Sequence, residues 1–220
     1  MPDGVDTKVL IPPRTRLAKT DSDDPLDYYY KPLTARVYRA RLAAAGRLLG
    51  IGPFRRILEV GYGSGILLPE LARRGTGLAA IDIHSAQGAV AESMRELGVD
   101  VELSTASLYE IPFEAGAFDA LVCLSVLEHL TDLDGALDEF RRVLEPGGVA
   151  IVGFPVRNPV TDAFFRLAGY KPREIHPAGH ADILRAVERE PGFELERELR
   201  VPRWFPRPLS GYVVCRCVAR

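Results

Sequence analysis

The stretch Ile57-Leu-Glu-Val-Gly-Tyr-Gly-Ser-Gly65 decides the fold and the place of the functional site. Its first four residues are apolar except for one Glu and predict a buried parallel strand. Alternating glycines follow at Gly61, Gly63 and Gly65, and a helical pattern runs over Ile66–Arg74. Glycine has no Cβ and adopts positive φ without steric cost, so this turn lets backbone approach a ligand closely. The segment therefore predicts a ligand site at the end of a strand.

The spacing of the glycines narrows the class of ligand. A dinucleotide fingerprint needs Gly-x-Gly-x-x-Gly/Ala, but Ile66 occupies its last position. A phosphate-binding loop needs Gly-Lys-Ser/Thr, and the segment contains no lysine. What remains is Glu-x-Gly-x-Gly-x-Gly, which resembles motif I of the class I S-adenosylmethionine (SAM) dependent methyltransferases. The resemblance implies that the cofactor is SAM.

Composition sets the broad class of protein. The chain has 220 residues, of which 47% are hydrophobic and 26% charged, as expected for one globular domain with a substantial core. A net charge of −2 argues against a general nucleic-acid binder, which is usually basic. No apolar run is long enough for a transmembrane helix, and the polar N-terminus lacks the apolar core of a signal peptide. The three cysteines, Cys123, Cys215 and Cys217, form no pattern of disulfides or metal ligands, and we expect a cytoplasmic protein.

Predicted strands and helices alternate along the chain, which indicates a parallel sheet with helices on both faces. The final two strands have no helix between them and predict a hairpin, so one edge strand should run antiparallel. The predicted fold class is α/β, a Rossmann-like doubly wound sheet of seven strands. The predicted strands are Arg56–Val60, Gly77–Ile83, Val99–Ser104, Phe118–Leu124, Val149–Phe154, Phe193–Val201 and Gly211–Val218.

The same pattern divides the chain into a leader and one domain. Residues 1–27 are predicted to be a flexible leader or lid, and residues 28–220 a single domain. Its core covers 54–154, and a substrate-side insertion covers about 155–190. Gly75 is expected to end the helix after the glycine loop, and Glu145–Gly148 to form a sharp turn. Other predicted helices are Lys31–Leu49, one that ends at Leu97, Asp132–Leu144, Val160–Ala168 and Ala181–Arg189.

Three downstream segments extend the resemblance. Ile111-Pro-Phe113 with Phe118-Asp119 is similar to the family's Leu-Pro-Phe…Phe-Asp segment. Leu127-Glu-His-Leu130 is similar to the Leu-Glu-His motif after strand four, and Arg142–Gly148 to the turn before strand five. In this order they cover roughly residues 54–154 and resemble the type 11 methyltransferase group.

The resemblance places the ribose near Asp82, which ends the second predicted strand twenty-one positions after Gly61. A carboxylate there can accept hydrogen bonds from both ribose hydroxyls. The alternative is that Asp82 caps the following helix. We also predict that Ile83 and Leu124, at the ends of the second and fourth strands, contact the cofactor.

Two residues of the glycine segment carry competing interpretations. The resemblance places Glu59 near the methionine amino group, whereas the simpler interpretation is a buried carboxylate that accepts from loop N–H groups. Tyr62 either covers the methionine moiety or packs on the N-terminal leader.

Adenine recognition departs from the family pattern. Many relatives have an Asp that contacts the adenine amine five residues before the Pro of the Leu-Pro-Phe segment, where this chain has Ser107. A hydroxyl can accept the same hydrogen bond without charge assistance, so the bond is weaker. The N–H of Leu108 can also reach the ring.

Methyl transfer from a sulfonium is an in-line displacement, in which the protein mainly brings nucleophile and methyl carbon together. A hydroxyl or ammonium acceptor must also lose a proton, and histidine suits that task. The chain has His84, His129, His176 and His180. We predict His129 and His176 as catalytic candidates, whereas an acidic acceptor would need no protein base. No metal site is expected, because Pro177 and Gly179 would break the helix that a zinc pair at His176 and His180 requires.

These observations favour a SAM-dependent methyltransferase that acts on a small molecule, with O-methylation of a hydrophobic hydroxyl compound favoured. The alternative is a SAM-binding module without catalysis that supports a partner protein. A nicotinamide oxidoreductase is disfavoured by Ile66 and the terminal hairpin.

Basic and aromatic residues gather in residues 28–58, which carry seven basic residues and no acid, and in the tail Leu199–Arg220. Their simplest interpretation is an amphipathic helix packed on its own sheet, with Leu33, Val37 and Tyr38 on the packed side. The sharper interpretation is peripheral contact with anionic lipid, or a pocket for an apolar acceptor that bears a carboxylate or phosphate.

Overall fold

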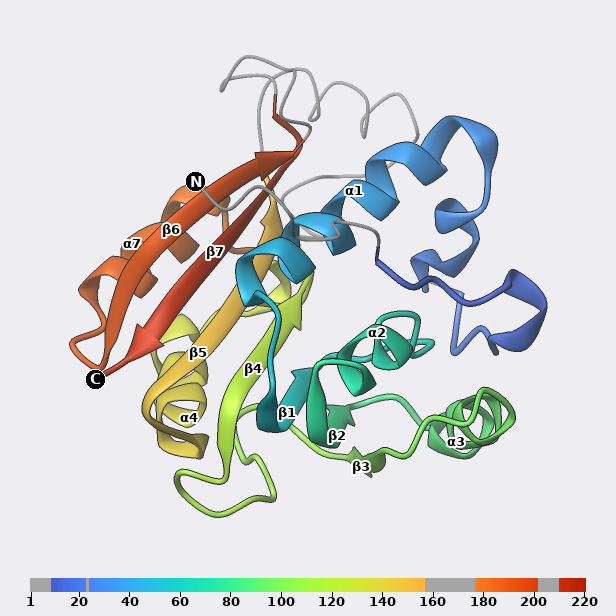
Figure 1. The fold of residues 1–220 in the computed structure, drawn as a ribbon. Helices are drawn as coiled ribbons and strands as arrows, with labels where there is room; N and C mark the ends of the chain where they lie inside the picture. Colours follow the sequence, from blue (N-terminus) through green and yellow to red (C-terminus); the bar gives the residue numbers. More distant parts are fainter. Residues whose placement is uncertain (1–8, 23, 157–176, 202–209) are drawn as a thin grey trace.

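The computed structural model describes residues 9–22, 24–156, 177–201 and 210–220. They form one mixed sheet with strand order β3-β2-β1-β4-β5-β7-β6 (Figure 1). The strands are β1 (Phe54–Val60), β2 (Gly75–Asp82), β3 (Glu102–Thr105), β4 (Phe118–Leu124), β5 (Leu144–Pro155), β6 (Phe193–Val201) and β7 (Tyr212–Ala219). The helices are α1 (Pro32–Leu49), α2 (Leu68–Ala72), α3 (Gln87–Glu96), α4 (Leu133–Val143) and α7 (His180–Arg189), and the short 3-10 helices are η1 (Arg14–Arg16), η2 (Pro25–Tyr29) and η3 (Leu127–His129).

The predicted fold class is confirmed, with one difference at the sheet edge. Strands β1 to β5 run parallel, and β7 runs antiparallel to both β5 and β6. The reversed strand therefore lies one place in from the edge, and β6 is the edge strand. Burial explains this order, because β7 is buried over most of its length whereas β6 is charged and partly exposed.

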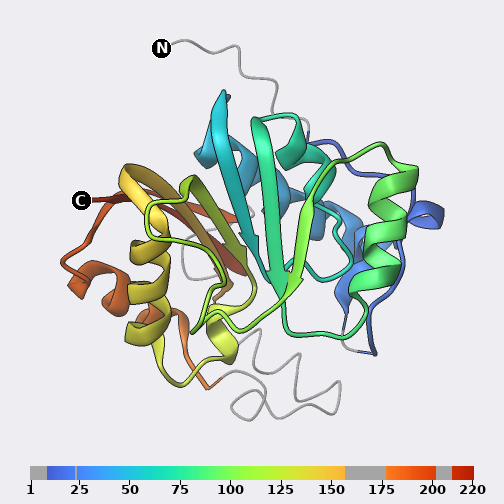
Figure 2. The ribbon, with the colours of Figure 1, turned by 90° about the horizontal axis from the view of Figure 1, so that it is seen from below.

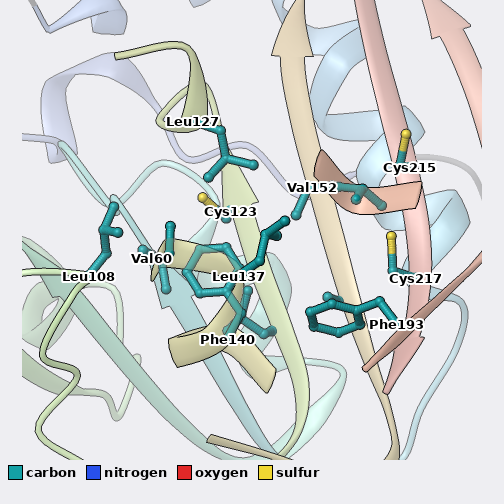
Figure 3. Close-up of a cluster of buried hydrophobic side chains, with 14 of the residues drawn as sticks. Val60, Leu108, Cys123, Leu127, Leu137, Phe140, Val152, Phe193, Cys215 and Cys217 are labelled. Carbon is teal, nitrogen blue, oxygen red and sulfur yellow. The ribbon is translucent and has the colours of Figure 1, made fainter. Parts of the chain in front are cut away.

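Helices cover both faces of the sheet (Figure 2). Helices α1, α2 and α3 contribute to one hydrophobic cluster, and α4 and α7 to the cluster on the other face. Figure 3 shows part of the second cluster, where Leu137 and Phe140 of α4 point toward Val60 and Cys123. The sheet is thus enclosed on both sides, and its strand ends are left for ligands.

All three cysteines are buried and free. Cys215 and Cys217 lie on the same face of β7, close to Phe193 (Figure 3). Burial raises the pKa of each of these thiols, so they stay protonated. They pack as small apolar side chains in the hydrophobic cluster.

Several predicted boundaries were wrong, and three of them show why. Helix α2 ends at Ala72, and Gly75 begins β2 because it pairs with Phe54 of β1. The stretch Glu145–Gly148 is part of β5, where the pairing with β4 shifts register. The third strand begins at Glu102 rather than Val99. In each case strand pairing decided the boundary.

Helix α1 begins at Pro32 and ends before Gly50, as predicted, but its first turns are not packed as predicted. Leu33 is 94% exposed and Val37 is 40% exposed. The buried residues of α1 begin at Leu42, because only the later turns lie on the sheet cluster.

Part of the leader packs on the domain. Leu17 and Leu26 are buried in the same cluster as α1. The backbone N–H of Leu10 donates to Glu70 Oε2 at 2.8 Å. Flexibility or lid movement of residues 1–27 stays a prediction. The predicted helix Val160–Ala168 and the candidate His176 lie outside the described residues. None of the helices described here is long and apolar enough to cross a membrane.

Candidate active site

The three glycines after β1 have different roles, although all have positive φ. A Cβ on Gly61 would lie 2.3 Å from Val126 Cγ2, and one on Gly65 would lie 3.0 Å from Leu68 Cδ1. These two glycines let neighbouring elements pack. A Cβ on Gly63 would meet no atom within 4 Å. Gly63 therefore presents bare backbone to open space, as a ligand-binding turn requires.

Asp82 at the end of β2 stabilises this loop. Its Oδ2 accepts from the N–H of Gly63 at 2.8 Å, and its Oδ1 accepts from the N–H groups of Ile83 and His84 at 2.7 and 3.3 Å. Asp82 does not cap α3, whose N-cap is Ala86. A carboxylate can accept about four hydrogen bonds, so Asp82 keeps capacity for a ligand hydroxyl.

Tyr62 and His84 pack against each other beside the loop. The two rings meet edge to face with centroids 4.8 Å apart. His84 Nδ1 accepts from the N–H of Ala86, so Nε2 carries the proton toward the carbonyl of Gly63 at 3.1 Å. Tyr62 is buried in the cluster that contains leader residues Leu17 and Leu26, and its hydroxyl has no partner.

Glu59 lies next to last in β1 and is 6% exposed. Its Oε2 is buried and has no hydrogen-bond partner, which contradicts the simpler interpretation of a carboxylate satisfied by loop N–H groups. Burial, and then the negative charge of Asp82, raise the pKa of Glu59 well above its ordinary value. A buried carboxyl of this kind suits a ligand that brings a positive charge, such as the ammonium of an amino acid.

The remaining predicted cofactor residues lie at the ends of neighbouring strands. Ile83 is 79% exposed directly after β2. Ser107 is exposed and its Oγ accepts from the N–H of Tyr109 at 3.2 Å, whereas Leu108 is buried. Leu124 ends β4 and is half-buried. All four lie at or just beyond the carboxyl ends of β2, β3 and β4.

Beyond β4, the sequence interpretation singled out His129 and missed its neighbour. His129 ends η3 with an exposed side chain, and His180 begins α7. Glu128 is 3% exposed, and its Oε2 has no partner. Burial raises the pKa of Glu128 to about 7, against the opposing effects of a hydrogen bond from its own backbone N–H and then of the charge of Arg41. The signal available in the sequence was a Glu inside the Leu-Glu-His motif.

Ser125 separates β4 from η3 and has a φ of +59°, which is rare outside glycine and costs about 1–3 kcal/mol. Its Oγ lies 2.9 Å from the hydroxyl of Tyr212 and 3.4 Å from Arg41 Nη1. Its N–H donates to the carbonyl of Gly153 at 2.7 Å. This conformation directs a polar side chain toward α1.

Buried polar atoms without partners gather at the carboxyl ends of the strands. Within the described residues such side-chain atoms belong to Glu59, Tyr62, Glu128, Arg41 and Arg200. The first three lie at or just beyond the ends of β1 and β4, and Arg41 contacts Ser125 after β4. Unsatisfied buried groups are rare and indicate a functional site. The arrangement fits a cofactor with an ammonium group beside Glu59 and an acceptor beyond β4.

The fold and the open glycine loop together define a Rossmann-like methyltransferase. The family model described as "Methyltransferase domain" matches residues 58–152. A solved structure of similar fold is geranyl diphosphate C-methyltransferase from Streptomyces coelicolor A3(2), with a TM-score of 0.69 and 17% identity over 92% of this chain and 87% of that one.

Relatives by sequence include a ubiquinone biosynthesis O-methyltransferase of Alkalilimnicola ehrlichii, 34% identical over 78% of this chain and 69% of that protein. The enzyme of the same name from Psychrobacter cryohalolentis is 32% identical over 50% of this chain and 44% of that protein. The chain belongs to the class I SAM-dependent methyltransferases, and SAM is its cofactor.

Proposed function

We propose that this enzyme transfers the methyl group of SAM to the hydroxyl oxygen of a small hydrophobic molecule. The observation that carries the proposal is that the open Gly63 turn and the buried carboxyl of Glu128, whose Oε2 has no partner, both lie at the carboxyl ends of the strands. The relatives named for ubiquinone biosynthesis, which are O-methyltransferases, support oxygen as the acceptor atom.

The residues around the glycine loop would hold the cofactor. Glu59 would accept from the methionine ammonium, and Asp82 from the ribose hydroxyls. Gly63 would allow the close approach, with Gly61, Gly65 and Tyr62 shaping the turn. Ile83, Ser107, Leu108 and Leu124 would line the adenosine side. SAM supplies a methyl group already activated by its sulfonium, so the chain has to orient the acceptor and accept a proton.

The identity of the proton acceptor belongs to the same proposal. His129 and His176 stay predictions from the sequence. His129 is exposed, whereas Glu128 beside it is buried with a pKa of about 7. A carboxyl whose pKa lies near the working pH is suited to general-base catalysis.

The surface formed by the end of η2 and the first turns of α1 supports contact with lipid as a further part of the proposal. Tyr28, Leu33 and Val37 expose apolar side chains near Lys31. Sedimentation with anionic vesicles at low salt, reversed at high salt, would support this contact. We place the enzyme in the cytoplasm because its three cysteines are free.

The test of O-methylation uses matched acceptors. The protein is incubated with SAM that carries an isotopic label in its methyl group and with a phenol, catechol or aniline of similar shape. We expect mass spectrometry to find the label on oxygen in the phenol and catechol products. Labelling of the aniline alone would contradict oxygen as the acceptor atom, while leaving the methyltransferase family intact.

A further inference from the structure

The direct contacts of Arg41 in α1 are with neutral groups. Its Nη2 lies 3.2 Å from the hydroxyl of Tyr29, and its Nη1 lies 3.4 Å from Ser125 Oγ. Its Cζ lies 4.0 Å from the centre of the Tyr38 ring and 4.9 Å from that of Tyr212. The Nε is buried and has no partner. No carboxylate of the described residues forms an ion pair with Arg41.

A partly buried guanidinium without a counter-ion loses part of its hydration and gains little from phenol rings alone. Its Nε, Nη1 and Nη2 form a rigid fork of donors that suits an oxyanion. Arg41 therefore has the properties of an anion-binding group whose ligand comes from outside the chain.

Glu128 has an oxygen that lacks a hydrogen-bond donor, whereas Arg41 has a nitrogen that lacks an acceptor. The backbone carbonyl of Glu128 is held by the N–H of Ala178 at 3.3 Å, while its side-chain Oε2 has no partner. The positive charge of Arg41 acts on Glu128, yet the two do not form an ion pair. A group that donates a hydrogen bond to Glu128 and accepts one from Arg41 would satisfy both.

The loop after β4 carries Glu128 and also Ser125, which contacts Arg41. Ser125 and Glu128 lie on either side of Val126, whose Cγ2 packs where a Cβ of Gly61 would lie. The loop that carries both polar side chains is therefore in contact with the cofactor loop. Because an acceptor has to lie next to the cofactor, this contact makes the loop that carries Glu128 a candidate part of the acceptor site.

We propose that Arg41 and Glu128 form the acceptor subsite and that it takes a weakly acidic hydroxyl, of the phenol or enol class. The hydroxyl O–H bond breaks, its proton forms a new O–H bond on Glu128 Oε2, and its electron pair stays on the acceptor oxygen. That oxyanion accepts from Arg41 and from the hydroxyl of Tyr29. The proposal rests on the O-methylation proposed above and adds the residues that select the acceptor.

Charge balance favours this arrangement. Before the proton moves, the negative charge is on Glu128, and afterwards it is on the acceptor oxygen. Arg41 compensates one negative charge in both states, so the low-dielectric site gains no net charge. Among the described residues, the other titratable groups that sense Glu128 are Tyr212 of β7 and Cys123 of β4. Burial raises the pKa of both, so they stay neutral.

The first experiment measures ionisation of a bound acceptor without SAM. The probe is 4-nitrocatechol, whose phenolate absorbs at longer wavelength than its phenol. We expect the wild-type protein to bind it and to shift its ionisation to lower pH. Arg41→Gln should weaken binding about 10- to 100-fold, the size of one charge-assisted hydrogen bond, and abolish the shift. Arg47→Gln, an exposed change on the same helix, is the matched control.

Two further variants keep the test decisive if Arg41→Gln does not fold. Tyr29→Phe keeps the ring and should weaken probe binding about 3- to 10-fold, because it removes one neutral donor. Glu128→Gln should keep probe binding and lower the methylation rate of a phenol about 10²–10⁴-fold, the range for loss of a general base. Glu188→Gln, an exposed change, is its control.

The outcomes separate this subsite from the proposed function. Wild-type probe binding in Arg41→Gln and Tyr29→Phe, with normal turnover in Glu128→Gln, would overturn the subsite and leave O-methylation standing. Probe binding that depends on Arg41, with no O-methylated product from the wild-type protein, would contradict O-methylation and leave an anion-binding subsite. A probe that binds to the wild-type protein without any change in its ionisation would also overturn the proposed subsite.

Discussion

The candidate active site has a cofactor half and an acceptor half, and the two are built in different ways. The cofactor half consists of residues 59–84, where β1, the glycine loop and β2 follow each other closely in the sequence. The acceptor half brings Tyr29 and Arg41 from the N-terminal region together with Ser125 and Tyr212. The first half relies on backbone geometry and the second on side chains. A short motif can therefore identify the cofactor, whereas the acceptor depends on long-range packing.

The largest effect is expected in the cofactor half. Gly63→Val places a branched side chain in the open space at the turn, and we expect SAM binding to fall below detection by calorimetry. The control is Gly147→Val in β5, because Gly147 also has a positive φ and open surroundings. Both variants bear a backbone strain of about 1–2 kcal/mol. Equal SAM affinity in the two variants would show that Gly63 is not at the site.

The next effect concerns stability in the acceptor half. Glu128 has a pKa of about 7 in the folded protein and an ordinary value of 4.5 when unfolded. Its contribution to stability is complete below pH 4.5 and is lost as the pH rises through 7. The loss amounts to about 3 kcal/mol.

Glu128→Gln should remove this part of the pH dependence, so its free energy of unfolding changes less between pH 5 and 8 than that of the wild type. Urea unfolding at pH 5 and pH 8 measures the free energy of unfolding of the wild type and of the variant, with Glu188→Gln as the exposed control. Identical pH profiles would show that the carboxyl of Glu128 is not buried in solution.

Asp82→Ala tests whether the loop carboxylate also binds the ribose. We expect SAM affinity to fall about 10- to 100-fold, because charge-assisted hydrogen bonds are lost. Asp119→Ala is the matched control, since that carboxylate also accepts from two backbone N–H groups, those of Arg55 and Arg56 at the far end of the sheet. A decrease in SAM affinity of less than about threefold would count against contact with the ribose.

Glu59→Gln should change affinity and stability in opposite directions. We expect SAM to bind about tenfold more weakly, because the neutral amide attracts an ammonium less. Burial raises the pKa of Glu59, so the ligand-free variant should be more stable than the wild type at pH 8.

Glu70→Gln is the informative contrast. Glu70 of α2 is also buried, but its carboxylate forms an ion pair with Arg74. Loss of this ion pair in Glu70→Gln should lower the melting temperature and leave SAM affinity unchanged. A Glu59 variant that behaves like the Glu70 variant would make Glu59 a structural residue.

The smallest effect is expected at His129. If Glu128 accepts the proton, His129→Ala should keep the methylation rate within about threefold, whereas loss of a general base costs about 10²–10⁴-fold. Single-turnover kinetics with a phenolic acceptor provide the measurement. A rate reduced a hundredfold, with unchanged SAM affinity, would return the role of base to His129.

The sequence predicted β4 and β6 to the residue because each combines a continuous pattern with clear flanking turns. It did not predict that Gly75 begins a strand, because that depends on pairing with β1. It also placed Leu33 on the packed side of α1, although the sheet covers only the later turns. Periodicity shows which residues share a face, but not how far a neighbouring element extends.

By itself, the sequence determined the fold class, the cofactor and the place of the glycine loop, because those depend on residues that lie close together along the chain. Only the tertiary structure decided that Gly63 faces open space while Gly61 and Gly65 pack against side chains. It also placed Arg41 beside Tyr29 and the loop that carries Glu128. Such unsatisfied buried groups arise when segments that are far apart in the sequence pack together and exclude water, so no local sequence pattern predicts them.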